Sequence, residues 1–227
     1  MSAGAESPTT PRALVFCDVD ETLINCKTMF DFLDYYLTDG YGDAGRRRAE
    51  RTRRDLTTQA AMGMPREQAN REYYRVWRGE RAAAVDRAAG AWWATRGAQP
   101  DFFITATWAE LAGHRAAGSP IVLVSGSFPA ILESIAAAVG AERLLCTHPE
   151  IRDGRYTGEI VGDAMIGEAK SKAVRVVFGE YPTVAPADCF AYGDHVSDLP
   201  MLAEVGHPVV VGGDARLLRA LPHARVL

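Results

Sequence analysis

The chain has 227 residues, of which 48% are hydrophobic and 24% are charged, and its formal net charge is −4. These values are typical of a globular protein with one sizeable core and room for an insertion, and they exclude a disordered chain. The acidic balance argues against nucleic acid as the main partner, and no apolar stretch approaches the ~20 residues that span a bilayer.

Residues 1–11 form a polar tail that we expect to be disordered. The tail has no apolar signal region, so the cytoplasm is the expected compartment and no membrane partner is expected. The cysteines form no Cys-x-x-Cys pair, and we expect buried thiols rather than disulfides or zinc ligands. They are Cys17, Cys26, Cys146 and Cys189.

The first predicted element is a buried strand over the apolar run 13–17, which is too short for a helix. Apolar residues at helical spacing over 28–37 then predict a helix. The segment 43–97 continues as further helices, with breaks expected near Asp39-Gly40, Gly63-Met64-Pro65, Gly79 and Gly97. We interpret residues 27–98 as an all-helical insertion.

Two features of the insertion have ordinary structural interpretations. The Trp92-Trp93 pair is more typical of a helical core than of a substrate platform. The run of arginines at 46–48, 51, 53 and 54 is more typical of a solvated helix face than of a binding site.

Strands and helices alternate after the insertion, beginning with a helix from Asp101 to about Gly118. We then predict a strand over 121–124, a helix over 129–139, a strand over 143–147, a hairpin over 151–161, a helix over 168–178, a strand over 189–193, a helix over 199–205, a strand over 208–211 and a helix from Asp214. This alternation predicts an α/β fold with a doubly wound parallel sheet. Residues 12–26 and 99–227 would form this Rossmann-like core.

Polar side chains follow three of the predicted strands. Asp18 and Asp20 end the first strand, Ser125 follows the second, and Asp194 follows the strand over 189–193. Ligands of open α/β sheets bind at the carboxyl edge of the strands. The sequence therefore predicts one site built from carboxylates and a hydroxyl, and Lys170 lies at the start of a later helix.

These motifs resemble the haloacid dehalogenase superfamily and, within it, the phosphoserine phosphatase-like subclass with a helical cap inserted after the first motif. The resemblance covers the chain from Ala13 onward. Its motifs are Asp18-Val19-Asp20-Glu21-Thr22, Ser125-Gly126-Ser127, Gly167-Glu168-Ala169-Lys170 and the run from Tyr192 to Leu202. It implies that the insertion 27–98 is the cap.

The resemblance implies a catalytic role for two aspartates. Asp18 would attack phosphorus and become phosphorylated, while Asp20 would protonate the leaving alkoxide and then activate water. Superfamily members that cleave carbon–halogen bonds lack the second acid, so Asp20 favours phosphate chemistry. Thr22 would fix the loop by hydrogen bonding.

The resemblance also implies Mg²⁺ as the cofactor, bound by oxygen ligands only. The metal ligands would be the carboxylates of Asp18 and Asp194, the backbone carbonyl of Asp20, and Asp198 directly or through water. Asp198 has a second interpretation, as a cap of the helix that follows it. His195 we interpret as a loop residue near the metal rather than as a catalytic group.

Phosphate binding would fall to Ser125 and to the backbone N–H groups of Gly126 and Ser127, at a strand-to-helix turn that favours an anion. Lys170 would supply a positive charge beside Asp18. Lys172 competes for this role, but two residues apart on a helix they face different sides. The family pattern selects Lys170, and we expect Lys172 to be solvated.

Substrate choice is expected to depend on the cap, which holds 14 basic and 10 acidic residues. Lys27 stands where phosphoserine phosphatases carry a glutamate that reads the substrate ammonium, so we predict that phosphoserine is a poor substrate. A small phosphorylated metabolite with a carboxylate, a second phosphate or neutral hydroxyls is expected instead. Glu21 replaces a smaller residue often found in the family.

Three functions remain open from the sequence. The first is a Mg²⁺-dependent phosphatase that acts on a small phosphate monoester. The second is a phosphotransferase or phosphomutase that uses the same aspartyl-phosphate, and the third is a non-catalytic regulatory binding protein. The expected partner is a small phosphorylated metabolite, and the expected assembly is a monomer or homodimer.

Overall fold

The computed structural model describes residues 11–227, so ten of the eleven residues of the predicted tail lie outside the described part. Within 11–227, six strands form a parallel sheet in the order β3-β2-β1-β6-β7-β8. Their bounds are β1 Val15–Cys17, β2 Ile121–Ser125, β3 Arg143–Cys146, β6 Phe190–Gly193, β7 His207–Val210 and β8 Arg225–Val226. The predicted α/β fold with a parallel sheet is confirmed.

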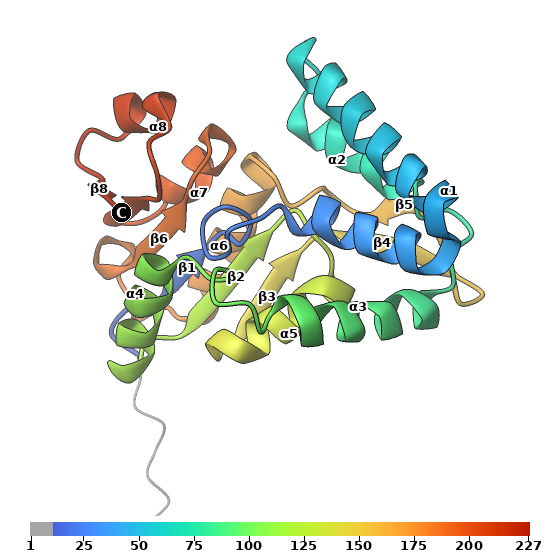
Figure 1. Ribbon diagram of the computed structural model, residues 1–227. Coiled ribbons are helices and arrows are strands. Elements are labelled where there is room, and N and C mark those ends of the chain that lie inside the picture. The colour runs from blue at the N-terminus through green and yellow to red at the C-terminus, as the bar shows by residue number, and fades with distance from the viewer. Residues whose placement is uncertain (1–10) are drawn as a thin grey trace, which may run out of the picture.

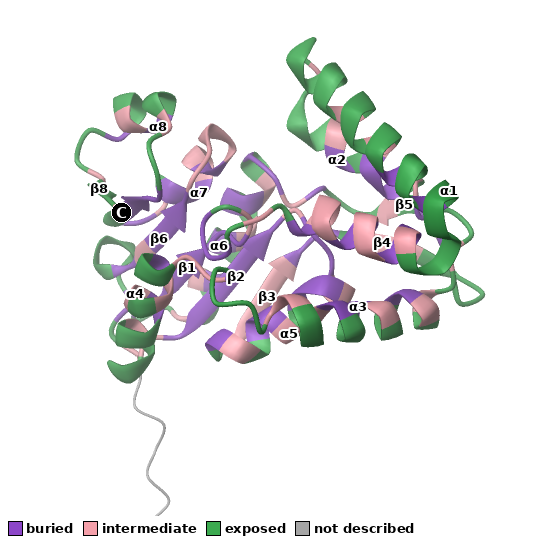
Figure 2. Ribbon diagram, viewed as in Figure 1, coloured by how far each residue is buried: buried purple, intermediate pink, exposed green. Residues whose placement is uncertain are grey.

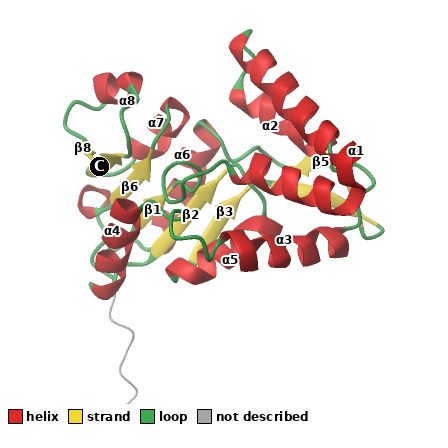
Figure 3. Ribbon diagram, viewed as in Figure 1, coloured by secondary structure: helices red, strands yellow, loops and turns green. Residues whose placement is uncertain are grey.

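Helices cover both faces of the sheet (Figure 3). They are α1 Thr28–Ala61, α2 Arg66–Arg75, α3 Ala82–Arg96, α4 Thr105–Ala116, α5 Pro129–Val139, α6 Glu168–Glu180, α7 Leu199–Leu202 and α8 Ala215–Ala220, with short 3-10 helices at Pro186–Asp188 and Val196–Asp198. Helices α4 and α5 pack on one face with Val15 and Cys17. Helices α6, α7 and α8 pack on the other face with Leu14 and Phe16. Successive strand residues point to opposite faces, which explains this division.

The helices α1, α2 and α3 lie together to one side of the sheet (Figure 1). The antiparallel hairpin of β4, His148–Arg152, and β5, Arg155–Val161, joins them there. Its backbone is hydrogen bonded to the loop between α2 and α3, through Gly79 to Tyr156 and Ala82 to Gly154. The hairpin that we placed in the core is thus also attached to the cap. The domain boundaries themselves stay a prediction.

A cluster of aromatic rings joins the cap to the sheet. Phe32 of α1 stacks on Trp77, and Phe128, which precedes α5, lies against Trp77 and Tyr74 with ring centroids 5.5 and 5.7 Å apart. All four side chains are buried. In Figure 2, the strands of the sheet are mostly buried, whereas α1 and α2 carry broad exposed faces. This aromatic packing fixes the cap helices above the segment that begins at Ser125.

Several expectations for the insertion are confirmed and one is wrong. Trp92 and Trp93 belong to the hydrophobic core. The arginines at 46–48, 51, 53 and 54 are exposed. The break predicted near Asp39-Gly40 is displaced to Gly42, where φ is +56° within α1. A glycine adopts this conformation without a side-chain clash, and the sequence pattern did not show which glycine does so.

The remaining departures are short. The helix predicted over 199–205 is regular only to Leu202, and β8 was not predicted because two exposed residues carry no strand pattern. The hairpin turns at Asp153 and Gly154, both with positive φ, as the sequence predicts. All four cysteines are free. No helix within 11–227 combines the length and apolar character needed to cross a membrane.

The junction before β7 yields a first prediction. A Cβ atom at Gly206 would lie 2.0 Å from the backbone carbonyl oxygen of Ala187. The two residues precede the neighbouring strands β7 and β6. We expect Gly206→Ala to lower the free energy of unfolding by about 3 kcal/mol, as measured by urea denaturation.

Gly213→Ala is the matched control, since nothing lies within 4 Å of a Cβ atom there. It should leave the unfolding midpoint nearly unchanged. Equal stability of the two variants would contradict the close approach at Gly206.

Candidate active site

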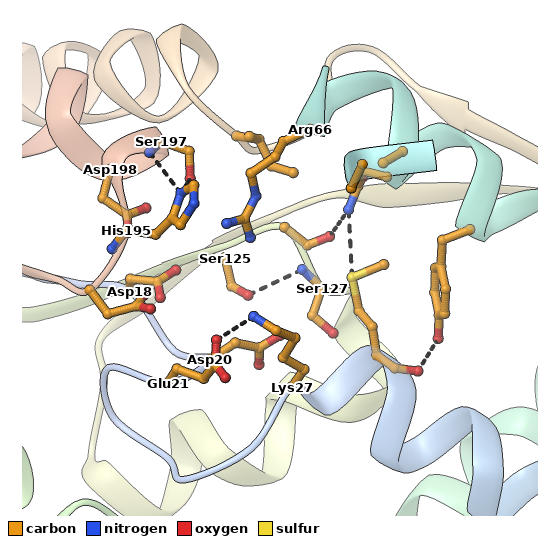
Figure 4. A pocket seen from close by; sticks show the side chains of 18 of the residues that line it. Asp18, Asp20, Glu21, Lys27, Arg66, Ser125, Ser127, His195, Ser197 and Asp198 are labelled. Atoms are coloured by element: carbon orange, nitrogen blue, oxygen red, sulfur yellow. Dashed lines mark hydrogen bonds and ion pairs between the residues drawn. The ribbon is translucent and has the colours of Figure 1, made fainter. Parts of the chain in front are cut away.

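One cavity of about 480 Å³ opens at the carboxyl edge of the sheet. It is lined by most of the residues that the sequence singled out, and Figure 4 shows their side chains converging from separate elements. They are Asp18, Asp20, Glu21, Lys27, Ser125, Gly126, Ser127, Lys170, Asp194, His195 and Asp198. Lys172 is exposed on α6, as expected. The structure thus brings together segments that lie far apart in the chain.

Lys170 links two buried carboxylates at the floor of the cavity. Its Nζ lies 2.5 Å from Oδ1 of Asp18 and 2.7 Å from Oδ1 of Asp198. Burial lowers the pKa of Lys170, but the charges of Asp18 and Asp198 raise it further than burial lowers it. The ammonium is therefore held in its charged form.

Three carboxylates at this floor form a group that could hold a metal ion. One oxygen each of Asp18, Asp194 and Asp198 lies within 4.8 Å of the others. Burial, followed by the charges of Asp18 and Asp198, raises the pKa of Asp194 to about 7, and burial also raises the pKa of Asp18. Crowded carboxylates with oxygen donors only fit a hard divalent cation, which would relieve their repulsion.

Asp20 lies two residues after Asp18, but its carboxylate turns to the cap. Its Oδ1 accepts bonds from the backbone N–H and the hydroxyl of Thr28, at 3.1 and 2.8 Å. Burial and then the charge of Asp18 raise the pKa of Asp20 to about 7. A carboxyl with this pKa can both give and take a proton near neutral pH. Its side chain does not join the three carboxylates of the metal group.

Thr28 is a site residue that the sequence analysis missed. It is fully buried as the first residue of α1, and its hydroxyl lies 3.0 Å from Oγ of Ser127 as well as bonding Asp20. Because the Thr28 proton points to the carboxylate, its oxygen can accept the Ser127 proton. In the sequence, the only sign of this contact was a threonine at the start of a predicted helix.

The loop Ser125 to Ser127 is held from both sides. Ser125 Oγ accepts the Ser127 N–H at 3.1 Å, which leaves its own proton free to donate. The carbonyl of Gly126 accepts bonds from the side chains of Asn70 and Tyr74, both at 2.9 Å. Both donors come from α2, so the cap fixes the expected phosphate loop, a role that the sequence did not show.

Asp198 lies in the carboxylate group that could hold a metal ion, but its side chain does not cap α7, the helix that follows it. Its Oδ2 accepts the backbone N–H of His195 at 3.2 Å, which closes a capping box, while its Oδ1 bonds Lys170. Gly193 makes this possible, since a Cβ atom there would lie 2.7 Å from Cβ of Asp198. Thr22 Oγ1 donates to Oδ1 of Asp194 at 3.2 Å and so fixes the loop as expected.

The mouth of the cavity carries charged side chains. Lys27 forms an ion pair with Glu21, whose backbone φ of +61° is unusual for a residue other than glycine. Burial, followed by the charge of Arg66, lowers the pKa of His195 to about 4, so its ring is neutral at pH 7. A neutral ring bonded to Ser197 agrees with its interpretation as a loop residue.

A family model described as haloacid dehalogenase-like hydrolase matches residues 15–203. A probable phosphatase of Mycobacterium tuberculosis (strain ATCC 25618 / H37Rv) is 40% identical over 109 residues, which are 47% of this chain and 37% of the relative. A phosphoserine phosphatase of the same organism is 35% identical over 112 residues, which are 49% of this chain and 36% of the relative. The chain therefore covers little more than a third of the length of these relatives.

Two solved structures are similar over nearly the whole chain. A protein of unknown function from Bordetella pertussis Tohama I has a TM-score of 0.83 and 26% identity, covering 96% of this chain and 99% of that one. A structure described as a phospho-aspartyl intermediate analogue of phosphoserine phosphatase has a TM-score of 0.68 and 18% identity, covering 95% and 92%. The second likeness shows a shared fold.

The Thr28 hydroxyl gives a second prediction. Thr28→Val keeps the side-chain shape but leaves Asp20 and Ser127 without this partner, so we expect the free energy of unfolding to fall by about 1–3 kcal/mol. Urea denaturation at pH 7 measures the change.

Thr107→Val is the matched control on α4. The Thr107 hydroxyl is also buried but has no hydrogen-bond partner among residues 11–227, so its removal should be neutral or stabilising. A Thr28→Val variant as stable as Thr107→Val would show that the Thr28 contacts contribute nothing.

Proposed function

The chain belongs to the haloacid dehalogenase-like hydrolase family, and we propose that it is a Mg²⁺-dependent phosphatase that hydrolyses a small phosphate monoester through an aspartyl-phosphate. The observation that carries this proposal is the division of the carboxylates. Asp18 lies in the metal-binding group beside Lys170, whereas Asp20 is held apart by Thr28 with a pKa of about 7. The names of the relatives support phosphate chemistry.

The first half-reaction transfers the phosphoryl group to the enzyme. The Asp18 carboxylate attacks phosphorus, the bond between phosphorus and the leaving oxygen breaks, and Asp20 gives its proton to that oxygen. Ser125 donates to a phosphoryl oxygen from the loop that Asn70 and Tyr74 fix. Lys170, which is itself held by Asp198, keeps Asp18 in place during the attack.

The second half-reaction releases phosphate. Asp20, now ionised, takes a proton from water, and the water oxygen attacks the phosphorus of the acyl phosphate to restore the Asp18 carboxylate. Asp18, Asp194 and Asp198, with the Asp20 carbonyl, would hold Mg²⁺, which when bound neutralises charge on the phosphoryl group and keeps Asp18 ionised.

Replacement of the nucleophile tests the proposal. We expect the wild type to hydrolyse an aryl phosphate with Mg²⁺, to lose this activity in EDTA and to regain it when Mg²⁺ is restored. Asp18→Asn cannot form the acyl phosphate and should lower kcat by at least about 10³-fold. Asp153→Asn, in the hairpin turn, is the matched control and should keep the wild-type rate.

Hydrolysis by Asp18→Asn at the wild-type rate would overturn the proposed nucleophile. Release of the aryl alcohol only when an acceptor alcohol is supplied, with the phosphoryl group then found on that acceptor, would instead favour the phosphotransferase alternative. Product analysis with and without an acceptor separates the two reactions.

Lys27 gives a prediction about substrate choice. Its ammonium pairs with Glu21 and so leaves no free carboxylate at the mouth to bind the ammonium of phosphoserine, and we therefore expect low wild-type activity on phosphoserine. Lys27→Glu would place a second carboxylate beside Glu21 and should raise kcat/KM for phosphoserine about tenfold, equal to ~1.4 kcal/mol.

Lys172→Glu, exposed and outside the cavity, makes the same charge change as a control. Efficient phosphoserine turnover by the wild type, with no gain from Lys27→Glu, would refute this specificity.

A further inference from the structure

The cavity has two unlike walls. One wall is apolar and comes mainly from the cap helices, with Met29, Phe30, Leu56, Ala60, Met64 and Ala69. The other carries Arg66, the first residue of α2, His195 after β6, and Arg216 of α8. Figure 4 shows Arg66 extending from α2 into the space between His195 and Ser125. The basic wall therefore faces the position where a phosphate monoester would react.

Two of the three cations at the mouth are already matched by acids. Lys27 pairs with Glu21, and Arg216 pairs with Asp214 at 3.1 Å. The exposed side chain of Arg66 forms no ion pair or hydrogen bond with any residue in the described part of the chain. The mouth thus retains one unmatched positive charge, and that charge belongs to Arg66 rather than to Lys27.

His195 adds a second donor without an acceptor. Its Nδ1 accepts the backbone N–H of Ser197 at 3.0 Å, so the neutral ring carries its proton on Nε2. Nε2 lies 3.3 Å from Nη2 of Arg216, which also carries only protons to donate. Two donors facing each other leave room for one shared acceptor, and an anionic oxygen would accept from both.

We infer that Arg66, His195 and Arg216 form a subsite for a second anionic group of the substrate, a carboxylate or a second phosphate. The inference rests on the proposed phosphatase function and names its substrate class. Such a group would bridge α2 of the cap and α8 of the core, since Arg66 and Arg216 come from these two helices. The apolar wall would contact the carbon skeleton between the two anions.

Matched substrates test the subsite. Glycerol 3-phosphate and 3-phosphoglycerate differ by a carboxylate, whereas fructose 1-phosphate and fructose 1,6-bisphosphate differ by a phosphate. In one of the two pairs, we expect the wild type to prefer the member that carries the additional anionic group, by about tenfold or more in kcat/KM. The pair that shows the preference identifies the anion.

The Arg66→Gln variant should abolish this preference. For the member with the additional anionic group, we expect kcat/KM to fall about tenfold more than for its partner without that group, mainly through an increase in KM. Arg66→Lys should keep part of the preference. Arg75→Gln is the control on the same helix, because Arg75 is exposed, pairs with Glu72 and lies outside the cavity.

Each alternative result has a distinct meaning. Equal wild-type kcat/KM within both pairs overturns the subsite. An Arg66→Gln variant that lowers kcat/KM equally for both members of a pair also overturns it, since Arg66 would then contact the transferred phosphoryl group. Failure to hydrolyse the aryl phosphate overturns the proposed function instead. Calorimetry with the Asp18→Asn variant then measures binding alone. Tighter binding of the member with the additional anionic group should depend on Arg66.

Discussion

The structure depends on one electrostatic constraint, the crowding of three carboxylates around a single buried ammonium. Asp18, Asp194 and Asp198 come from the segments that follow two neighbouring strands, and Lys170 of α6 binds Asp18 and Asp198. One ammonium cannot balance three carboxylates, and a divalent cation bound by them would offset the remaining negative charge. The parallel sheet provides this geometry because it aligns the carboxyl ends of β1 and β6.

The cap completes the site instead of merely covering it. Asn70 and Tyr74 bond the Gly126 carbonyl, and Phe128 packs among the rings of Trp77 and Phe32. Any movement of α2 away from the sheet must break both hydrogen bonds and expose these rings. The position of the phosphate loop and the position of α2 are therefore coupled.

Sequence patterns predicted the elements and the carboxylates because both signals are local. An apolar run followed by Asp18, Ser125 or Asp194 shows a strand and its polar end within a few residues. Pairings across long separations carried no such signal, and the contacts of Asn70 with Gly126 and of Thr28 with Ser127 became visible only in the fold. The pairing of Lys27 with Glu21 was missed for another reason, since it depends on a backbone turn with positive φ at Glu21.

The first turn of α1 has a mechanical consequence for the proton step. Asp20 accepts the backbone N–H and the hydroxyl of Thr28, so the acid is fastened to the start of this helix, whereas Asp18 belongs to the sheet. In the proposed reaction, the alignment of the proton donor Asp20 with the nucleophile Asp18 therefore depends on the position of α1 relative to the sheet. In the proposed reaction, a tilt of α1 would change the rate of proton transfer through Asp20 without displacing Asp18.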